Sequence, residues 1–173
     1  MSNYRAQLTG RVLCAAAGLW LARRHRVELL RRPRGRWCGA LLALVVPATT
    51  ALVSARGRRR LQWQRRDAAA EGVVAAWVIS GALAEELLWR LPPLLSRHRA
   101  GYTAASALTF AALHIRRDGR DSAAGHLGLA MAWSVSAARD RSIFWPTVGH
   151  ILYNYAALSI TAPGTEQARA SCG

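Results

Sequence analysis

The sequence contains no lysine, and this absence affects how its charge is interpreted. The 173 residues carry 24 basic side chains, all of them arginine, against 9 acidic ones, for a formal net charge of +15. Exclusive use of arginine, in a chain rich in alanine and glycine, mainly indicates a coding bias. It is therefore weak evidence that the arginines were selected for bidentate hydrogen bonding to anionic groups. The arginines cluster between hydrophobic runs and not on one face, which favours membrane lipid over nucleic acid as a partner.

Cysteine is scarce and follows no pairing pattern. The three cysteines, Cys14, Cys38 and Cys172, are odd in number and form no CxxC, so neither a disulfide framework nor a cysteine-rich metal site is indicated. The HExxH motif of zinc peptidases is also absent. No small-x-small cleavage site follows the first apolar run, which ends at Leu21-Ala22-Arg23-Arg24. We therefore expect an uncleaved membrane segment and not a removed signal peptide.

Hydrophobic runs, in contrast, are abundant, since 52% of the residues are hydrophobic. Six apolar runs are separated by arginine-rich or proline-containing connections and predict six helices of an all-α, polytopic transmembrane bundle. The runs span about 7–22, 37–54, 68–91, 102–115, 123–138 and 143–162. The first run contains Arg11 and is short for a full span, so it is tilted, interfacial or adapted to a thin membrane. A weaker alternative is a soluble basic protein that binds nucleic acid through its arginine clusters.

One domain is expected from the length, with three segments. Residues 1–66 are predicted to form N-terminal membrane helices and basic connections, 67–162 a helical core, and 163–173 a disordered polar tail. The third run should end at Pro92-Pro93, which cannot continue a helix. The arginines divide almost evenly between the two sides of the bundle, so they do not set its orientation in the membrane.

The third run carries two carboxylates at a position where inserting a charge into a membrane costs free energy. No residue from Gly72 to Ala84 is charged, and Glu85 and Glu86 follow directly. A charge at the centre of a bilayer costs about 2.5–3.5 kcal/mol on insertion scales. Glu86 and Arg90 are four residues apart and can pair on one helix face, whereas Glu85 lies about 100° round the axis. Glu85 is therefore predicted to be a functional carboxylate.

The fourth and sixth runs add polar pairs at helical spacing. Phe110 and His114 share one face, and His150 and Asn154 share another. If these faces meet that of Glu85, an apolar bundle gains a small wet pocket that is equipped for peptide hydrolysis. A carboxylate with a neighbouring histidine can hold and deprotonate a water. A second histidine and an amide can donate hydrogen bonds to the oxyanion of the tetrahedral intermediate.

The motifs EExxxR, FxxxH and HxxxN, in this order on separate apolar helices, carry a family resemblance. They occur at residues 85–90, 110–114 and 150–154, with matching surroundings in 106–114 and 146–154. The chain resembles the CPBP family of CAAX-processing and bacteriocin-processing (abortive-infection type) intramembrane proteases, whose eukaryotic relatives trim prenylated CAAX proteins. The resemblance covers about Ala68 to Ile160. The family usually continues with glycine after the arginine, where this chain has Leu91-Pro92-Pro93, so a different helix exit is expected.

The resemblance implies an intramembrane endopeptidase in the cell membrane whose site lies inside a helical bundle. Its substrate would be a peptide or protein, including lipidated ones, and its other partner membrane lipid, with no nucleic acid. Roles carried over by motif position give Glu85 and His114 the activation of water. They give His150 and Asn154 the stabilisation of the oxyanion. Glu86 and Arg90 would hold the helix.

Two alternatives remain beside this hypothesis. Glu85, His114 and His150 are also a ligand set for zinc, although each would come from a different helix. We favour activated water without a bound metal and thus expect no cofactor. The second alternative is a non-enzymatic membrane scaffold or immunity-type protein that uses the same polar network for packing or partner binding. His126 matches no motif and is expected to be a polar residue facing the bundle.

Overall fold

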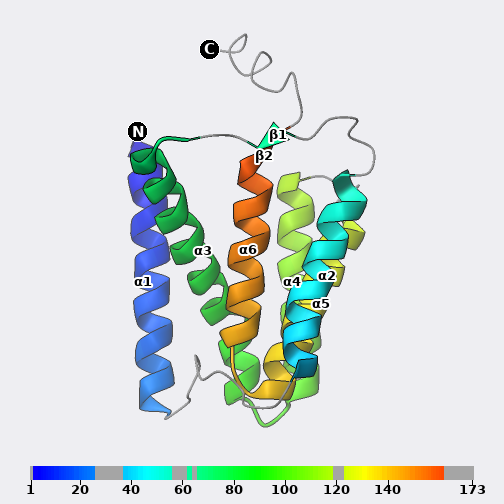
Figure 1. The fold of residues 1–173 in the computed structure, drawn as a ribbon. Coiled ribbons are helices and arrows are strands. Elements are labelled where there is room, and N and C mark those ends of the chain that lie inside the picture. The colour runs from blue at the N-terminus through cyan, green and yellow to red at the C-terminus, as the bar shows by residue number, and fades with distance from the viewer. Residues whose placement is uncertain (1, 26–36, 56–61, 64–65, 119–122, 162–173) are drawn as a thin grey trace.

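A computed structural model describes residues 2–25, 37–55, 62–63, 66–118 and 123–161. These residues contain six helices, and consecutive helices run in alternating directions (Figure 1). The helices are α1 Ser2–Arg24, α2 Trp37–Ala55, α3 Ala68–Leu95, α4 Arg99–Asp118, α5 Ala123–Asp140 and α6 Phe144–Ser159. Two short strands, β1 Gln62–Trp63 and β2 Ile160–Thr161, pair antiparallel. The expected all-α class with about six helices is confirmed, and the strand pair is an addition that hydrophobic runs did not indicate.

The helix bounds differ from the hydrophobic runs mainly at charged ends. α1 and α4 are longer than their runs because polar and charged residues continue the backbone hydrogen bonding beyond the apolar stretch. α6 is shorter, ending at Ser159, because Ile160–Thr161 pairs with β1 instead. The segment 163–173, predicted to be a disordered tail, lies outside the described residues.

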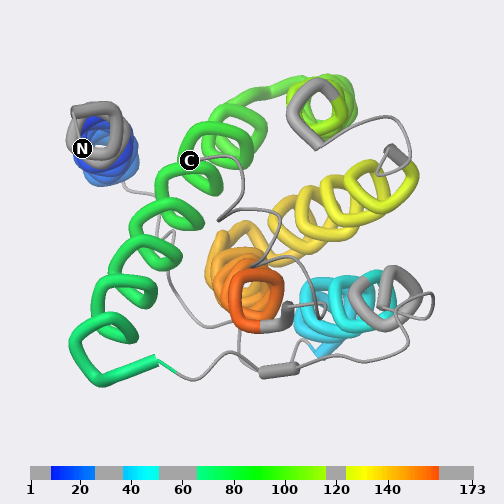
Figure 2. The backbone as a smooth tube through the Cα atoms, turned by 90° about the horizontal axis from the view of Figure 1, so that it is seen from above, coloured from blue at the N-terminus to red at the C-terminus, as the bar shows by residue number. Residues whose placement is uncertain are grey.

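The bundle places α6 among three other helices. α6 packs against α2, α3 and α5, while α4 packs against α3 and α5. Viewed from above, α1 lies on the outside of α3 (Figure 2). A residue on α6 that faces inward therefore meets side chains from helices that are distant in sequence.

The prediction that the third helix ends at Pro92-Pro93 is wrong. α3 includes both prolines and ends at Leu95. Proline at position 93 has no N–H, so the carbonyl of Trp89 loses its usual helical donor. The Ser106 hydroxyl of α4 donates a hydrogen bond to that carbonyl. A neighbouring helix thus satisfies the freed backbone group, as it commonly does in membrane helices.

Large apolar side chains cover much of the outer surface. Exposed examples occur on all six helices: Val12, Leu41, Ile79, Leu108, Met131 and Leu152. Contiguous exposed apolar surface is typical of contact with a partner or with lipid. Of the described helices, α3 alone is long and apolar enough to cross a membrane, by length and composition. The most apolar window of α3 is 33% buried, unlike the core helix of a soluble protein, which is mostly buried.

Gly149→Ala is expected to destabilise the bundle by about 1–3 kcal/mol through overpacking. A Cβ at Gly149 would collide with the backbone carbonyl of Ala43 on α2, which cannot move aside as a flexible side chain would. The matched control is Gly128→Ala on α5, where a Cβ meets nothing within 4 Å. The control should be neutral or slightly stabilising. Thermal unfolding of both variants in one detergent checks this, and equal melting temperatures would contradict it.

Candidate active site

Glu86 is the most deeply buried carboxylate of α3. Its side chain is 0% exposed, and its Oε2 lies 3.4 Å from Arg90 Nε, so the expected pair one helical turn apart is present. Its Oε1 accepts a hydrogen bond from His150 Nδ1 at 2.9 Å. Sequence reasoning missed this second contact. The adjacent glutamates were the available signal, since neighbours 100° apart on a helix can both reach one inward-facing partner.

Arg90 is enclosed by aromatic rings. Its guanidinium carbon lies 4.7 Å from the ring centre of Phe110 and 5.8 Å from that of Trp133. A cation over an aromatic face is attracted by the ring quadrupole, more strongly where water is excluded. The charge that balances Glu86 is therefore held by α4 and α5 as well as by α3 itself.

Glu85 points into the bundle and keeps some access to the outside. Its side chain is 27% exposed, against 0% for Glu86. Glu85 Oε2 lies 3.6 Å from His150 Nε2 and 3.9 Å from His114 Nε2. Both separations are too long for a direct hydrogen bond and are of the size that one bridging water spans. The three side chains converge from α3, α4 and α6, as the motifs predicted.

His114 has a defined tautomer when it is neutral. Its Nδ1 lies 2.9 Å from the carbonyl oxygen of Phe110, which can only accept, so Nδ1 carries the proton. Nε2, which faces Glu85, is then left with a lone pair. The ring also stacks on Phe110 at 4.1 Å between centres. His126, expected to face the bundle, has its ring 5.0 Å from that of His114, a proximity that no motif signalled.

His150 is held on both sides and is 2% exposed. Its ring stacks on Trp133 at 4.4 Å, with the planes 22° apart. Trp133 in turn donates from Nε1 to the carbonyl of Ala43 on α2 at 3.2 Å. Trp133 belongs to none of the three motifs. Its additional role is to fix the plane of the imidazole, while Glu86 fixes which nitrogen faces Glu85.

A cavity of about 270 Å³ opens beside these groups. It is lined by residues of α1, α3, α4 and α6: Arg11, Trp77, Val78, Gly81, Glu85, His114, His150, Asn154, Ala157 and Leu158. Asn154 thus borders the same space as Glu85 and the two histidines. This is the polar pocket that the helical spacing predicted, with one addition, the arginine of α1.

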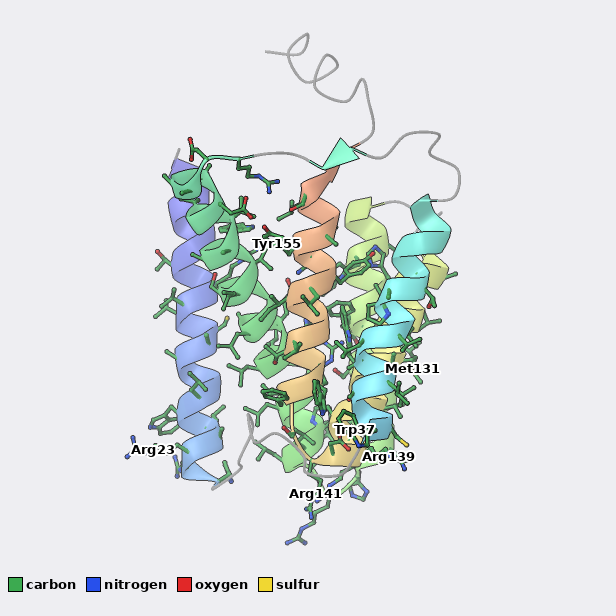
Figure 3. The ribbon with its side chains drawn as sticks, in the orientation of Figure 1. Arg23, Trp37, Met131, Arg139, Arg141 and Tyr155 are labelled. Atoms are coloured by element: carbon green, nitrogen blue, oxygen red, sulfur yellow. The ribbon has the colours of Figure 1, made fainter. Side chains whose placement is uncertain are left out.

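A polar clasp ties α3 to α6 near one end of the bundle. The Tyr155 hydroxyl of α6 donates to the Glu71 carboxylate of α3. Arg66 Nη1 lies 3.6 Å from Glu71 Oε2 and donates to Ser159 Oγ at 3.2 Å. Tyr155 lies between the two helices in the upper half of the bundle, whereas Arg139 and Arg141 lie at the opposite end (Figure 3). The clasp joins the helices that carry Glu85 and His150.

The zinc alternative meets an obstacle in this geometry. In the part of the chain that the structure describes, no three His, Cys, Asp or Glu side chains form a group that could hold a metal ion. Nδ1 of His150 is engaged by Glu86, which leaves Nε2 of both histidines facing Glu85.

The fold and the site define a helical protein with a glutamate and histidine centre inside a bundle whose outer surface is apolar. The family model described as "Type II CAAX prenyl endopeptidase Rce1-like" matches residues 69–156, just over half of the chain. The chain belongs to this Rce1-like (CPBP) family of polytopic, membrane-embedded proteases. The match extends from α3 to α6 and includes all six residues that were assigned roles by motif position. No curated protein and no solved structure matches the chain significantly.

Proposed function

We propose that the chain is an intramembrane endopeptidase that hydrolyses a peptide bond at or within the cell membrane. The observation that carries the proposal is the convergence of Glu85, His114 and His150. Glu85 Oε2 lies within 3.9 Å of both imidazole Nε2 atoms, at the wall of a cavity. Amphipathic packing does not require these groups to meet, and placing them inside a membrane bundle is costly without a use.

The attacking water is held by Glu85 and His114. The water donates one proton to Glu85 Oε2 and the other to the lone pair on His114 Nε2, so its own lone pair faces the substrate carbonyl. On attack, the Glu85 carboxylate takes the first proton as general base. The bond from His114 Nδ1 to the Phe110 carbonyl keeps the ring in the required tautomer.

The oxyanion of the tetrahedral intermediate accepts hydrogen bonds from His150 Nε2–H and from the side-chain amide of Asn154. In this step both nitrogens of His150 carry protons, and Nδ1 donates its proton to Glu86 Oε1 in a hydrogen bond. When the intermediate collapses, Glu85 returns its proton to the leaving amine, and the carbon–nitrogen bond breaks. The proton balance closes, and Glu85 ends as a carboxylate.

Glu86 and Arg90 position the other groups and do not touch the substrate. The Arg90 guanidinium stands against the Glu86 carboxylate, so these two buried charges offset each other. Neutrality matters because an uncompensated charge is costly in a low-dielectric interior. The substrate is a peptide or protein presented by the membrane, and a lipid anchor beside the cleaved bond would bring it there.

The test is cleavage by purified protein in liposomes, with a prenylated peptide and a hydrophobic transmembrane peptide as substrates and mass spectrometry of the products. We expect one product pair to appear and to persist after exhaustive treatment with a chelator. Loss of activity on chelation with recovery on added zinc would replace the water mechanism with the zinc mechanism. An absence of product from every substrate would favour the scaffold alternative. In that case substitutions in the polar network would lower stability or partner binding only.

A further inference from the structure

Arg11 brings a permanent positive charge to the cavity from outside the family match. It lies on α1, whereas the match begins at residue 69. Its Nη1 donates to the carbonyl of Trp77 at 3.3 Å, and its guanidinium carbon lies 3.6 Å from the centre of the Trp77 ring. Among the described residues that line the cavity, Arg11 is the one arginine. The remaining charged or titratable lining groups are Glu85 and the two histidines.

Gly81 of α3 leaves the space that the Arg11 side chain occupies. A Cβ at Gly81 would stand 2.6 Å from Arg11 Nη1 and 3.1 Å from its guanidinium carbon. The guanidinium therefore occupies the place that any larger side chain at position 81 would fill. Since α1 lies on the outside of α3, the glycine lets the arginine reach the cavity across the face of that helix.

An arginine in a membrane helix is costly at mid-bilayer, and those that face a bundle interior or a cavity mark substrate or ion pathways. Guanidinium binds carboxylate groups in a planar geometry with two parallel hydrogen bonds. The neighbouring walls, formed by Val78, Ala157 and Leu158, suit the apolar side chains of a peptide. The cavity thus has apolar walls, a cation at Arg11 and a water-activating centre at Glu85 and His114.

We propose that Arg11 binds a carboxylate of the peptide substrate near the bond that is cleaved, and this inference rests on the proposed proteolysis. Gly81 and Glu85 are one turn apart on α3, a rise of about 6 Å. This is the length of about two extended peptide residues. The carboxylate therefore lies about two residues from the scissile bond, as either the free C-terminus or an acidic side chain. Arg11 is a specificity residue that selects peptides cleaved close to such a group.

Binding is measured first, because it gives a result whether or not cleavage occurs. The probes are dansyl-labelled apolar tetrapeptides with a free C-terminal carboxylate, with a C-terminal amide, and with that amide plus an internal glutamate. The protein is held in phosphatidylcholine nanodiscs, which carry no net lipid charge. Loss of a charge-assisted hydrogen-bonding partner should weaken binding of the plain amide about tenfold to a hundredfold. The peptide amide with an internal glutamate distinguishes the two sources of the carboxylate. Tight binding of this peptide means that the site accepts an acidic side chain, and weak binding means that it accepts only the free C-terminus.

Two pairs of variants test whether Arg11 is responsible. Arg11→Gln should remove the preference for the free acid, whereas Arg24→Gln should keep it, because Arg24 lies over Trp20 on α1 and does not line the cavity. Gly81→Ala should weaken the preference by displacing the guanidinium while leaving the charge in the protein. Gly72→Ala, where a Cβ meets nothing within 4 Å, should not. Arg11→Lys should recover part of the preference.

Equal binding of acid and amide by the unaltered protein would overturn the proposal. So would a preference that survives Arg11→Gln in protein shown by thermal unfolding to be folded. These results differ from a failure of the proposed function. In that case no peptide is cleaved by any variant, but a carboxylate preference that depends on Arg11 would still be measured. Where cleavage occurs, Arg11→Gln should raise KM for the free acid and change kcat little.

Discussion

Replacing Glu85 with glutamine is expected to reduce kcat for peptide cleavage by about 10²- to 10⁴-fold, the usual contribution of a positioned general base. Glutamine has nearly the same shape, and its amide still reaches the space between His114 and His150. It cannot accept the proton of the attacking water, so the chemical step loses its base. Initial rates with reconstituted protein, measured beside thermal unfolding, check the expectation.

The matched control is Glu71→Gln on the same helix. Glu71 contacts Tyr155 and Arg66 in the clasp between α3 and α6 and does not line the cavity. Its replacement should leave kcat close to that of the unaltered protein. Full activity of the Glu85→Gln variant, or an equal loss in both variants, would refute the role of Glu85 as base.

Arg90→Leu is expected to destabilise the bundle by about 3–5 kcal/mol, because it leaves the Glu86 carboxylate buried without its compensating charge. Both partners are almost completely buried, at 0% and 1% exposure of their side chains, so solvent screens the pair little. Denaturation in one detergent compares the variant with the unaltered protein. The control is Arg24→Gln, which replaces an arginine at the exposed end of a helix. The free energy of unfolding should fall much more in Arg90→Leu than in this control.

The double variant Glu86→Gln with Arg90→Leu separates a buried-charge penalty from simple loss of packing. If the penalty dominates, the double variant should be more stable than Arg90→Leu alone, because no charge is left uncompensated. A double variant as destabilised as the sum of the two single changes would contradict this account. His150 should also lose its orientation when Glu86 is replaced, so kcat should fall even where stability recovers.

The motifs predicted the convergence of the site well, for a reason visible in their spacing. Phe110 with His114 and His150 with Asn154 each lie one turn apart, so helix formation alone puts each pair on one face. Glu86 with Arg90 pair in the same local way. An apolar helix that carries such a face has to turn it inward, since lipid cannot solvate it. The six helices followed from the length of the apolar runs.

The parts that the sequence did not predict all depend on contacts between distant residues. α3 continues through Pro92-Pro93 because Ser106, on the next helix, supplies the donor that the Trp89 carbonyl lacks. β1 and β2 pair across almost a hundred residues, so no local pattern could mark them. The hydrogen bond of Glu86 to His150 spans 64 positions, and its length depends on how α3 and α6 are set against each other.

The sequence alone was sufficient for the helices, for the polar faces upon them and for the family resemblance, because helical periodicity and the cost of charge in an apolar run are local properties. Packing alone decided which nitrogen of His150 faces Glu85, how Trp133 holds His150, and that Arg11 reaches the cavity past Gly81. These depend on the distances between helices to within an ångström. Such distances are set by every side chain at the interface together, and no single stretch of sequence records them.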